Sequence, residues 1–427
     1  MTPFSVLVVG SGAREHALVW ALGRSPSISE IWAVPGNPGI GNLASLVDLP
    51  VTDIDGITAW AVARGIGLVV VGPELPLSRG LADRLSERGI PVFGASRAAA
   101  ELEWSKAFAK AFMQRHRIPT AAWAEFNDAD AALTYARDAE YPLVVKADGL
   151  AAGKGVIICQ SPAEAEAAIR DILVDRVFGA AGSRIVIEEF LTGEELSVIA
   201  LVDGERIAVL PLARDYKRLH DGDGGPNTGG MGSFAPVRDL DPGLVDLVRE
   251  TILQPTIDGL RADGRTYRGA LYAGLMLTAD GPRVLEFNCR FGDPETQVIM
   301  PLLDGDLAAL LRDCAEGRLD SGSIAIHPGA AVCVVLAAAG YPEQPRSGDP
   351  IAGIDEAADR GALVFHAGTK MHDGQLVTAG GRVLSVVATG ADRAEAARRA
   401  YHAADAIHFA DRQLRRDIAE PRFVLAG

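Results

Sequence analysis

The sequence predicts an α/β protein, with a parallel, doubly wound sheet at its N-terminus and mixed α+β blocks after it. The first observation is the length of 427 residues, which at roughly 100–200 residues per domain predicts two to four domains. The second is the alternation of strand and helix patterns over the first hundred residues. The third is the series of short β runs in the last hundred residues.

The N-terminal block, residues 1–100, begins with a buried strand at Ser5–Val9 and a helix at Ala13–Leu22. Further strands are expected at Ile31–Val34 and Leu68–Val71, each followed by Gly or Pro. Strands that alternate with helices in this way usually pair in parallel. Near residue 100 the pattern changes to one long helix, Arg97–His116.

A second block is expected over residues 101–191 and contains the helix Pro162–Leu173. Its expected strands are Leu143–Lys146, Val156–Cys159 and Ile185–Glu189. A third block covers residues 192–325, with strands at Ser197–Leu201, Ile207–Leu210, Leu271–Leu277 and Arg283–Phe287. The last block, residues 326–427, is a small β-rich domain that ends in the helix Arg393–Ile407. Its strands are expected at Ala331–Leu336, Leu363–His366 and Val383–Ala388.

Composition excludes several classes of protein. With 41 basic and 56 acidic residues, the net charge is −15, which disfavours nucleic-acid binding because that needs a basic field. The longest apolar run, residues 330–339, is well short of the roughly 20 residues of a membrane span. The four cysteines are far apart with no CxxC pair, so neither a disulfide scaffold nor a zinc ribbon is expected. The first residues show no secretory leader, and we expect a cytoplasmic protein.

The segment Gly10–His16 lies between the first strand and the first helix. Glycines there let the backbone approach a phosphate at the helix N-terminus. A dinucleotide fingerprint does not fit, because Glu15 replaces its third glycine and the second strand ends at Asn37 without an acidic residue. Arg14 and His16 instead supply donors suited to a sugar phosphate, although a tight turn without a ligand is the alternative.

Two further glycine-rich segments are candidates for binding. Lys146–Gly155 joins two strands and carries Lys154, so we expect a hairpin that folds over a triphosphate. The alternative is a flexible hairpin whose lysines are solvated. Asp221–Gly232 holds six glycines in twelve residues and is expected to be neither helix nor regular strand. Such a loop is usually functional or disordered.

The strand Leu285–Arg290 carries the sharpest small pattern. Because strand side chains alternate, Glu286, Asn288 and Arg290 are expected on one face, with Leu285, Phe287 and Cys289 on the other. A carboxylate beside an amide oxygen suits Mg²⁺, and the arginine suits a carboxylate or acyl phosphate. For this pattern alone, an exposed face with an ordinary ion pair is the more frequent explanation.

Together these motifs resemble the phosphoribosylamine–glycine ligase family, ATP-grasp enzymes of purine biosynthesis. The segments that carry the resemblance are GSGAREHAL at 10–18, NPG at 37–39, GPE at 72–74, SKAFAK at 105–110, VVKADGLAAGKGV at 144–156, EEFLTGEE at 188–195, DGDGGPNTGGMG at 221–232 and LEFNCRFGDPETQ at 285–297. They follow the family's order over about two-thirds of the chain. The chain differs from the usual pattern in Ala13, in Tyr216, in Cys289 and in a short stretch at 212–215.

The resemblance implies a Rossmann-like N-terminal domain, a two-lobed ATP-grasp unit and a small C-terminal domain. Its nucleotide site would comprise Lys106, Lys146, Gly149, Gly153, Lys154, Gly155, Glu188, Glu189, Phe190, Leu191 and Glu195. Its phosphoribosylamine site would comprise Gly12, Arg14, Glu15, His16, Asn37, Gly39 and Glu74. Further substrate-binding residues, in the loop that would surround the reacting centre, are Asn227, Thr228, Gly229, Gly230 and Met231. Asp215, Lys217 and Arg290 are expected at the reacting centre. Glu286 and Asn288 are expected to bind Mg²⁺ or Mn²⁺.

The implied reaction has two steps. The carboxylate of glycine attacks the γ-phosphate of ATP to give glycyl phosphate, and the amine of 5-phosphoribosylamine then displaces phosphate to give glycinamide ribonucleotide. A monomer is expected. The alternatives are an ATP-grasp ligase for another acid or amine, a non-catalytic nucleotide-binding regulator and an NAD-linked oxidoreductase.

Overall fold

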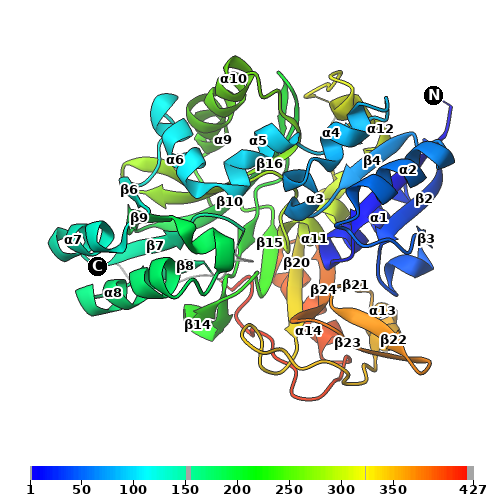
Figure 1. Ribbon diagram of the computed structural model, residues 1–427. Coiled ribbons are helices and arrows are strands. Elements are labelled where there is room, and N and C mark those ends of the chain that lie inside the picture. The colour runs from blue at the N-terminus through cyan, green and yellow to red at the C-terminus, as the bar shows by residue number, and fades with distance from the viewer. Residues whose placement is uncertain (1, 151–154, 323, 421–427) are drawn as a thin grey trace.

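The computed structural model describes residues 2–150, 155–322 and 324–420 (Figure 1). It shows four sheets of four or five strands together with helices packed on them, so the α/β class is confirmed. Within the described ranges, no helix has the length and apolar character that a membrane span needs. All four cysteines are buried and free, which agrees with the expectation that they form no disulfide scaffold.

The N-terminal sheet has the strand order β3-β2-β1-β4-β5, with all neighbours parallel. Its strands are β1 (Phe4–Gly10), β2 (Ile28–Pro35), β3 (Ser45–Leu46), β4 (Leu68–Val71) and β5 (Val92–Phe93). Its helices are α1 (Ala13–Leu22), α2 (Ile54–Arg64), α3 (Glu74–Ser78) and α4 (Leu81–Ser86). Because β1 is the central strand, the turns that follow β1 and β4 meet at one edge of the sheet, where ligands of such sheets bind.

The prediction of one long helix over Arg97–His116 is wrong, because this segment forms two helices. They are α5 (Arg97–Trp104) and α6 (Lys106–Arg115). Between them Ser105 is extended, and its hydroxyl accepts a hydrogen bond from the Phe108 amide and donates one to Asp148. The serine therefore caps a new helix whose N-terminus faces the second block.

The second block is an antiparallel sheet of order β6-β9-β7-β8. Its strands are β6 (Trp123–Phe126), β7 (Leu143–Ala147), β8 (Val156–Cys159) and β9 (Ile185–Glu189). Helices α7 (Ala129–Asp138) and α8 (Pro162–Ile169) pack on it, and α8 continues as a π-helical turn over Arg170–Val174. This small lobe has its own hydrophobic core.

The third block is an antiparallel sheet of order β11-β10-β16-β17. Its strands are β10 (Glu194–Asp203), β11 (Ile207–Val209), β16 (Arg268–Thr278) and β17 (Gly281–Asn288). Four helices accompany it: α9 (Leu244–Val248), α10 (Gln254–Ala262), α11 (Glu295–Ile299) and α12 (Leu307–Ala315).

A bulge corrects the expected faces of β17. Gly274 pairs with Glu286 and Leu275 pairs with Val284, so Leu285 is an extra residue in the strand. Phe287 and Cys289 lie in the main core as expected. Leu285 does not share their face; it packs on a separate small cluster of Ala121, Leu191 and Met276.

The glycine-rich segment 221–232 is more regular than expected. Residues Gly224–Asn227 form strand β14, which pairs with β13 (Arg218–His220). Positive φ angles at Gly222 (67°) and Gly225 (78°) make the reversal, and the segment then enters β15 (Gly232–Ala235). The expectation of no regular strand is therefore wrong for this stretch, because backbone pairing with β13 outweighs the poor strand propensity of glycine.

The C-terminal sheet has the order β12-β15-β20-β24-β21. Its strands are β12 (Arg214–Asp215), β15, β20 (Ala330–Ala337), β21 (Leu363–His366) and β24 (Arg382–Gly390). The helices α13 (Ile354–Asp359) and α14 (Arg393–Ala404) and the hairpin β22 (Thr369–His372)–β23 (Gln375–Thr378) complete this body, and a short pair, β18 (Leu303–Asp304) with β19 (Ala325–Ile326), precedes it. Two of its five strands precede residue 236, so this sheet joins distant parts of the chain. The domain boundaries expected at 100, 191 and 325 stay predictions.

Candidate active site

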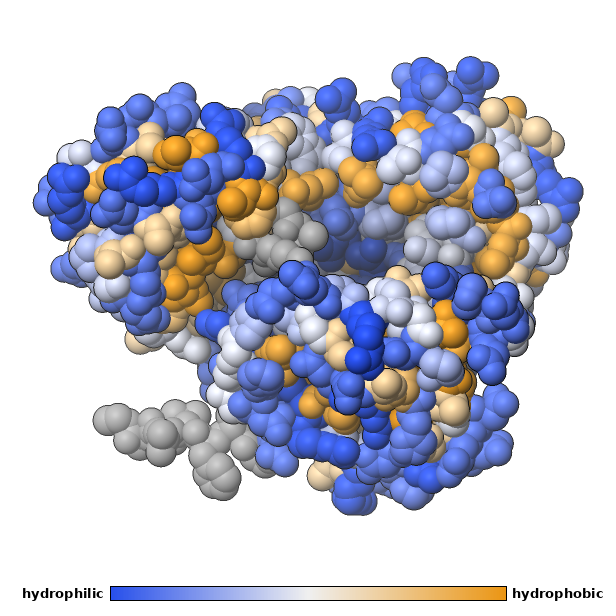
Figure 2. Space-filling view, turned by 60° about the horizontal axis from the view of Figure 1, so that its bottom comes forward, coloured by the Kyte–Doolittle hydropathy of each residue, from blue (hydrophilic) through white to orange (hydrophobic). Residues whose placement is uncertain are grey.

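The space-filling view shows a recess between the C-terminal body in front and the rest of the molecule behind it, with hydrophilic residues in its depth (Figure 2). Hydrogen bonds and ion pairs connect the segments around this centre. The N-terminal turn bonds to the segment after β17, and that segment bonds to β24. Helix α6 bonds to β9 and to the turn after β7.

A buried cluster of charges joins the small lobe to α6. The Glu188 carboxylate lies 2.8 Å from Lys146 Nζ and 2.7 Å from Lys110 Nζ, and all three side chains are less than one-tenth exposed. Burial lowers the pKa of Lys110 to about 8, although Glu188 opposes this shift. Lys146 also donates to the Leu285 carbonyl at 3.1 Å. The two lysines are therefore held with their charges close together by one carboxylate.

Lys106 lies at the start of α6 and donates to the Gly149 carbonyl at 3.1 Å. Gly149 has φ +147°, and a Cβ there would lie 2.7 Å from that of Ala181, so the start of the hairpin requires glycine. Gly155 accepts a hydrogen bond from the Ala147 amide and closes the hairpin onto β7. Gly153 and Lys154 lie outside the described residues.

The strands of the two lobes meet at Glu189–Glu195. Leu191 packs with Leu285 and Met276 and forms an apolar surface beside Lys146. Glu189 accepts from the Ala122 amide and lies 3.0 Å from Arg283, whereas Phe190 is half-buried. Glu195 lies 2.9 Å from Lys217.

Glu286 is the carboxylate with the most unusual surroundings. Burial raises its pKa, but Lys217, Lys146, Lys106 and Arg290 together outweigh burial and hold the pKa below its ordinary value. The Glu286 carboxylate nevertheless makes no hydrogen bond or ion pair with any residue in the described ranges. An ionised carboxylate without a direct partner, among four cations, is suited to bind a cation together with an anionic ligand.

Asn288 lies two residues further along β17. Its Oδ1 accepts a hydrogen bond from Arg290 at 2.8 Å. Arg290 Nε lies 3.1 Å from Glu103 and 3.3 Å from Glu74, so α5 and α3 fix the guanidinium. Glu103 also accepts from the Cys289 amide at 2.7 Å, and burial raises the pKa of Glu103 to about 7.

The donor set fits a magnesium-like ion rather than a transition metal. No group of three or more His, Cys, Asp or Glu residues that suits a metal occurs in the parts of the chain that the structure describes. Glu286 and Asn288 are two oxygen donors on one strand face. Mg²⁺ typically takes one or two protein carboxylates and completes its shell with water and substrate phosphates.

A second buried acidic group lies beside Lys217. Asp215 Oδ1 is buried and has no hydrogen-bond partner in the described structure. Burial and the nearby Glu295 raise the pKa of Asp215 well above its ordinary value. Burial alone would lower the pKa of Lys217, but Glu195 and the other anionic groups raise it. The Glu295 carboxylate accepts a hydrogen bond from Ser197, whose hydroxyl also lies 3.0 Å from that of Tyr272.

The N-terminal turn is held by Glu15. Its carboxylate accepts from the Gly12 amide at 2.6 Å and pairs with Arg14, which donates to the Phe291 carbonyl at 3.2 Å. A Cβ at Gly10 or at Gly72 would lie within 2.5 Å of the Glu15 side chain. The two glycines therefore make room for a carboxylate that folds back under the turn.

His16 and Asn37 connect this turn to the C-terminal body. His16 Nδ1 accepts a hydrogen bond from the His366 amide at 2.8 Å, and the Asn37 side chain donates to the His366 carbonyl at 2.8 Å. Burial, with His366 nearby, lowers the pKa of His16 to about 3, so the ring is neutral. A Cβ at Gly39 would lie 2.5 Å from both histidine rings.

The loop before β15 contains the remaining expected residues. Asn227 ends β14, and the Thr228 hydroxyl donates to the Lys217 carbonyl and accepts from the Gly230 amide. The Met231 side chain is fully buried in a cluster with Leu219 and Ala337. Its side chain therefore packs the loop onto β20 and is not exposed to a ligand.

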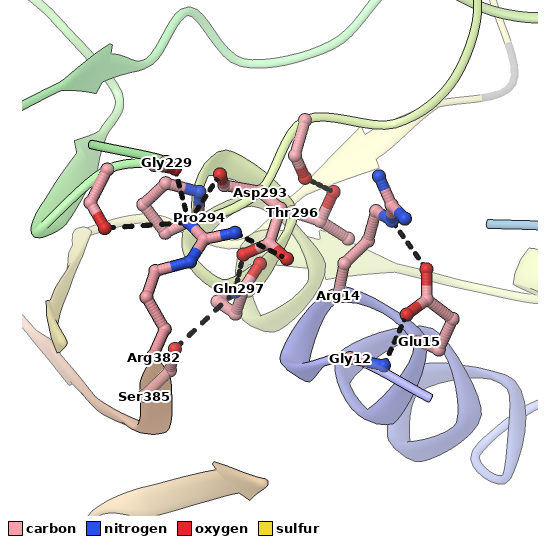
Figure 3. A network of polar contacts seen from close by, with 12 residues as sticks. Gly12, Arg14, Glu15, Gly229, Asp293, Pro294, Thr296, Gln297, Arg382 and Ser385 are labelled. Carbon is pink, nitrogen blue, oxygen red and sulfur yellow. Dashed lines mark hydrogen bonds and ion pairs between the residues drawn. The ribbon is translucent and has the colours of Figure 1, made fainter. Parts of the chain in front are cut away.

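Four residues with prominent contacts at this site were not expected from the sequence: Glu103, Lys110, His366 and Arg382. Glu103 and Lys110 flank or belong to the SKAFAK motif, and that motif was the available signal for them. Arg382 contacts Gly229, Gly230 and Asp293, as Figure 3 shows for Gly229 and Asp293, and no sequence pattern singled it out.

The comparisons with known proteins agree over nearly the whole chain. Family models match as the phosphoribosylglycinamide synthetase N domain at residues 4–103, its ATP-grasp domain at 104–296 and its C domain at 331–421. The phosphoribosylamine–glycine ligase of Vibrio cholerae is 48% identical over 97% of both chains, and that of Caulobacter vibrioides is 49% identical over 98% of both.

Solved structures show the same relationship. The crystal structure of phosphoribosylamine–glycine ligase from Thermotoga maritima superposes with a TM-score of 0.85 at 38% identity, covering 97% of this chain and 99% of that one. The biotin carboxylase domain of Hydrogenobacter thermophilus 2-oxoglutarate carboxylase, at 17% identity, TM-score 0.72 and coverage of 97% and 92%, shares the fold. The chain therefore belongs to the phosphoribosylamine–glycine ligase family, the ATP-grasp ligases of purine biosynthesis.

Proposed function

We propose that this chain joins glycine to 5-phosphoribosylamine with ATP, giving glycinamide ribonucleotide, ADP and phosphate. Its family membership supports the reaction. The structural observation that carries the proposal is the Glu286 carboxylate, which is ionised among four cations and has no direct partner in the described structure. That arrangement suits a metal-bound triphosphate.

The chemistry requires activation because a carboxylate does not react with an amine at neutral pH. Attack of a glycine carboxylate oxygen on the γ-phosphorus forms a P–O bond and releases ADP. Attack of the amine on the acyl carbon then forms the C–N bond and releases phosphate, with loss of the amine proton. Both steps depend on positioning and charge neutralisation rather than on a side-chain nucleophile.

The nucleotide is proposed to lie between the two lobes. Adenine would pack on the apolar surface of Leu191, Leu285 and Met276, with the backbone of Glu188–Leu191 at its edge. Glu195 would bind the ribose hydroxyls. Lys106, Lys146 and the Gly149–Gly155 hairpin would hold the phosphates. The charges of Lys106 and Lys146 lie near each other, with Lys106 against the Gly149 carbonyl and Lys146 against Glu188.

Glu286 and Asn288 are proposed to hold Mg²⁺ or Mn²⁺. Such an ion neutralises phosphate charge in the transition state. The protein's own part is to present the two oxygens, and Arg290 orients Asn288 through a hydrogen bond.

Arg290 and Lys217 are proposed to face the glycyl phosphate, and Asp215 to face the amine. The buried Oδ1 of Asp215 lacks a partner in the described ranges, so an N–H group of a substrate would satisfy it. Asp215 is therefore the candidate acceptor for the proton that the amine loses.

5-Phosphoribosylamine is proposed to occupy the edge where the turns after β1 and β4 meet. The amides at the start of α1, with Arg14, suit its phosphate, and Glu74 with the Asn37–Gly39 turn suits its ribose. Glu15, His16 and Asn37 have side chains engaged by the protein, so they would act by shaping this turn.

ADP release tests the proposal in a coupled assay. The oligomeric state of the purified protein is first measured by sedimentation. The protein is then assayed with ATP, glycine and freshly prepared 5-phosphoribosylamine, and in control reactions that omit one of the two substrates glycine and 5-phosphoribosylamine. We expect sustained ADP release only when both substrates are present, whereas glycine alone should give no more than about one ADP and one acyl phosphate per active site. ADP release that needs another acid or amine would show a different ligase, and ATP binding without turnover would show a regulator.

A further inference from the structure

Two side chains from the C-terminal body hold the backbone of Gly229. Arg382, the first residue of β24, donates to the Gly229 carbonyl and, at 3.5 Å, to the Gly230 carbonyl. The Tyr341 hydroxyl accepts from the Gly229 amide at 2.9 Å. Both polar groups of Gly229 are therefore bonded to residues that follow β20 in the chain.

The same guanidinium reaches the turn before α11. It donates to the Asp293 carbonyl at 2.9 Å and lies 3.2 Å from the Asp293 carboxylate (Figure 3). The other Asp293 oxygen accepts from Gln297 at 2.7 Å. Arg382 thus joins the glycine loop and the Asp293–Pro294 turn, which lie far apart in sequence.

At Gly230 the backbone of the loop lies closely against Pro294 and Asp215. Gly230 has φ +106°, and a Cβ there would lie 2.5 Å from Pro294 Cδ and 2.7 Å from Asp215 Oδ1. A Cβ at Gly12 would lie 3.6 Å from Asp293 Oδ2, so the turn adjoins the start of α1. Arg382 therefore holds segments next to Asp215 and to the N-terminal turn.

These contacts lie beside Asp215, which we propose above to face the amine of the substrate. Within the described structure, the guanidinium of Arg382 forms hydrogen bonds and ion pairs only with Gly229, Gly230 and Asp293. It makes none with the buried lysine cluster around Glu188, which we assign to the nucleotide.

We propose that Arg382 and Tyr341 are positioning residues for 5-phosphoribosylamine: they hold the Gly229–Gly230 loop against the Asp293–Pro294 turn so that the amine meets Asp215. The C-terminal body would then help to position the substrate at the reacting centre. This inference rests on the proposed function, since it concerns the second half of that reaction.

Steady-state kinetics of Arg382→Met, Arg382→Ala and Tyr341→Phe test the inference. Arg346→Met is the matched control, because Arg346 also belongs to the C-terminal body and binds a carbonyl and two carboxylates, at Ala410, Asp349 and Asp411. Wild-type protein is assayed first. If it shows no ADP release that depends on glycine and 5-phosphoribosylamine, the proposed function fails, whatever the variants do.

With active wild type, Arg382→Met should lower kcat/KM for 5-phosphoribosylamine about 100-fold, the typical effect of misplacing reacting groups by about 1 Å. KM for ATP should stay near the wild-type value, and guanidinium chloride should partly restore Arg382→Ala. Tyr341→Phe should show a smaller loss of the same kind, with faster hydrogen exchange at Gly229 and Met231.

A folded Arg382→Met with wild-type kcat/KM overturns the inference, as does a loss shared equally by ATP and the amine or matched by Arg346→Met. If Arg382→Met does not fold, Tyr341→Phe decides, because it removes one hydroxyl only. Unchanged kinetics and unchanged exchange in that variant also overturn the inference.

Discussion

Lys110 Nζ lies 2.7 Å from Glu188 Oε2, and the two side chains are 3% and 2% exposed. Glu188 also pairs with Lys146, so one buried carboxylate is shared by two lysines. This sharing means that the three residues do not contribute equally to stability. The carboxylate is the member whose loss leaves uncompensated charge.

Glu188→Gln should therefore destabilise the nucleotide-free protein by about 3–5 kcal/mol, because it leaves two buried lysines facing each other. Lys110→Met should cost much less, since a neutral Lys146–Glu188 pair remains and methionine fills the space. Urea unfolding measures both. The double variant should recover part of the Glu188→Gln loss; equal losses in the two single variants would contradict this account.

Glu286→Gln should reduce the rate of ADP release about 10²–10³-fold, the usual effect of removing a preorganised charged or hydrogen-bonding group at a reacting centre. It should also raise the Mg²⁺ concentration for half-maximal rate. Asp280→Asn, in the exposed turn before β17 on the same sheet, is the control. Wild-type activity of Glu286→Gln at low Mg²⁺ would be incompatible with a metal at this carboxylate.

The neutral state of His16 makes stability depend on pH. The pKa of His16 falls from an ordinary value near 6.5 to about 3 in the fold, so between these values the unfolded chain binds more protons. Stability is therefore fully present above about pH 6.5 and falls as the pH decreases toward 3, by about 2 kcal/mol at about pH 5. His16→Asn should remove this part of the slope.

The measurement for His16 is a series of urea unfolding curves between about pH 4.5 and 7.5. The exposed His372, replaced in the same way, supplies the matched control. Parallel pH profiles for wild type and His16→Asn would show that burial of the His16 ring does not lower its pKa.

Gly230→Ala should abolish ligation, because the new methyl group meets Pro294 and Asp215 in a backbone conformation with positive φ. Gly222→Ala is the comparison: φ is also positive there, but the space around it is open. That variant should lose about 1 kcal/mol of stability and retain activity. Rates and unfolding midpoints of the two variants, measured together, separate backbone strain from collision at the site.

Sequence patterns predicted those parts of the candidate site whose residues are close together along the chain. Glu286, Asn288 and Arg290 follow from strand periodicity, and the N-terminal turn follows from glycines at a strand–helix junction. The partners that hold these residues are distant: 186 residues separate Glu103 from the Cys289 amide it binds, and 153 separate Arg382 from Gly229. No local pattern encodes such pairs, because tertiary packing brings them together.

The bulge at Leu285 and the break at Ser105 were missed for a related reason. A regular strand and a continuous helix both suit the apolar pattern of the local sequence. Packing of Leu285 on Leu191 favours the bulge, and the hydrogen bonds of Ser105 with Asp148 and the Phe108 amide favour the break between the helices. In each case the irregularity places a group at the site: Leu285 on the apolar surface and the N-terminus of α6 beside Asp148. The proposed site therefore adjoins two departures from regular secondary structure.

The mixed order of the C-terminal sheet has a consequence for synthesis of the protein on the ribosome. Strand β15 has β12 on one edge, but its other edge stays unpaired until β20, at Ala330–Ala337, has been translated. A nascent chain therefore carries the Gly229–Gly230 segment beside an open strand edge for much of its elongation, and such edges invite mispairing. Chains that end before Ala330 lack strand β20, which pairs with this edge of β15 in the folded protein.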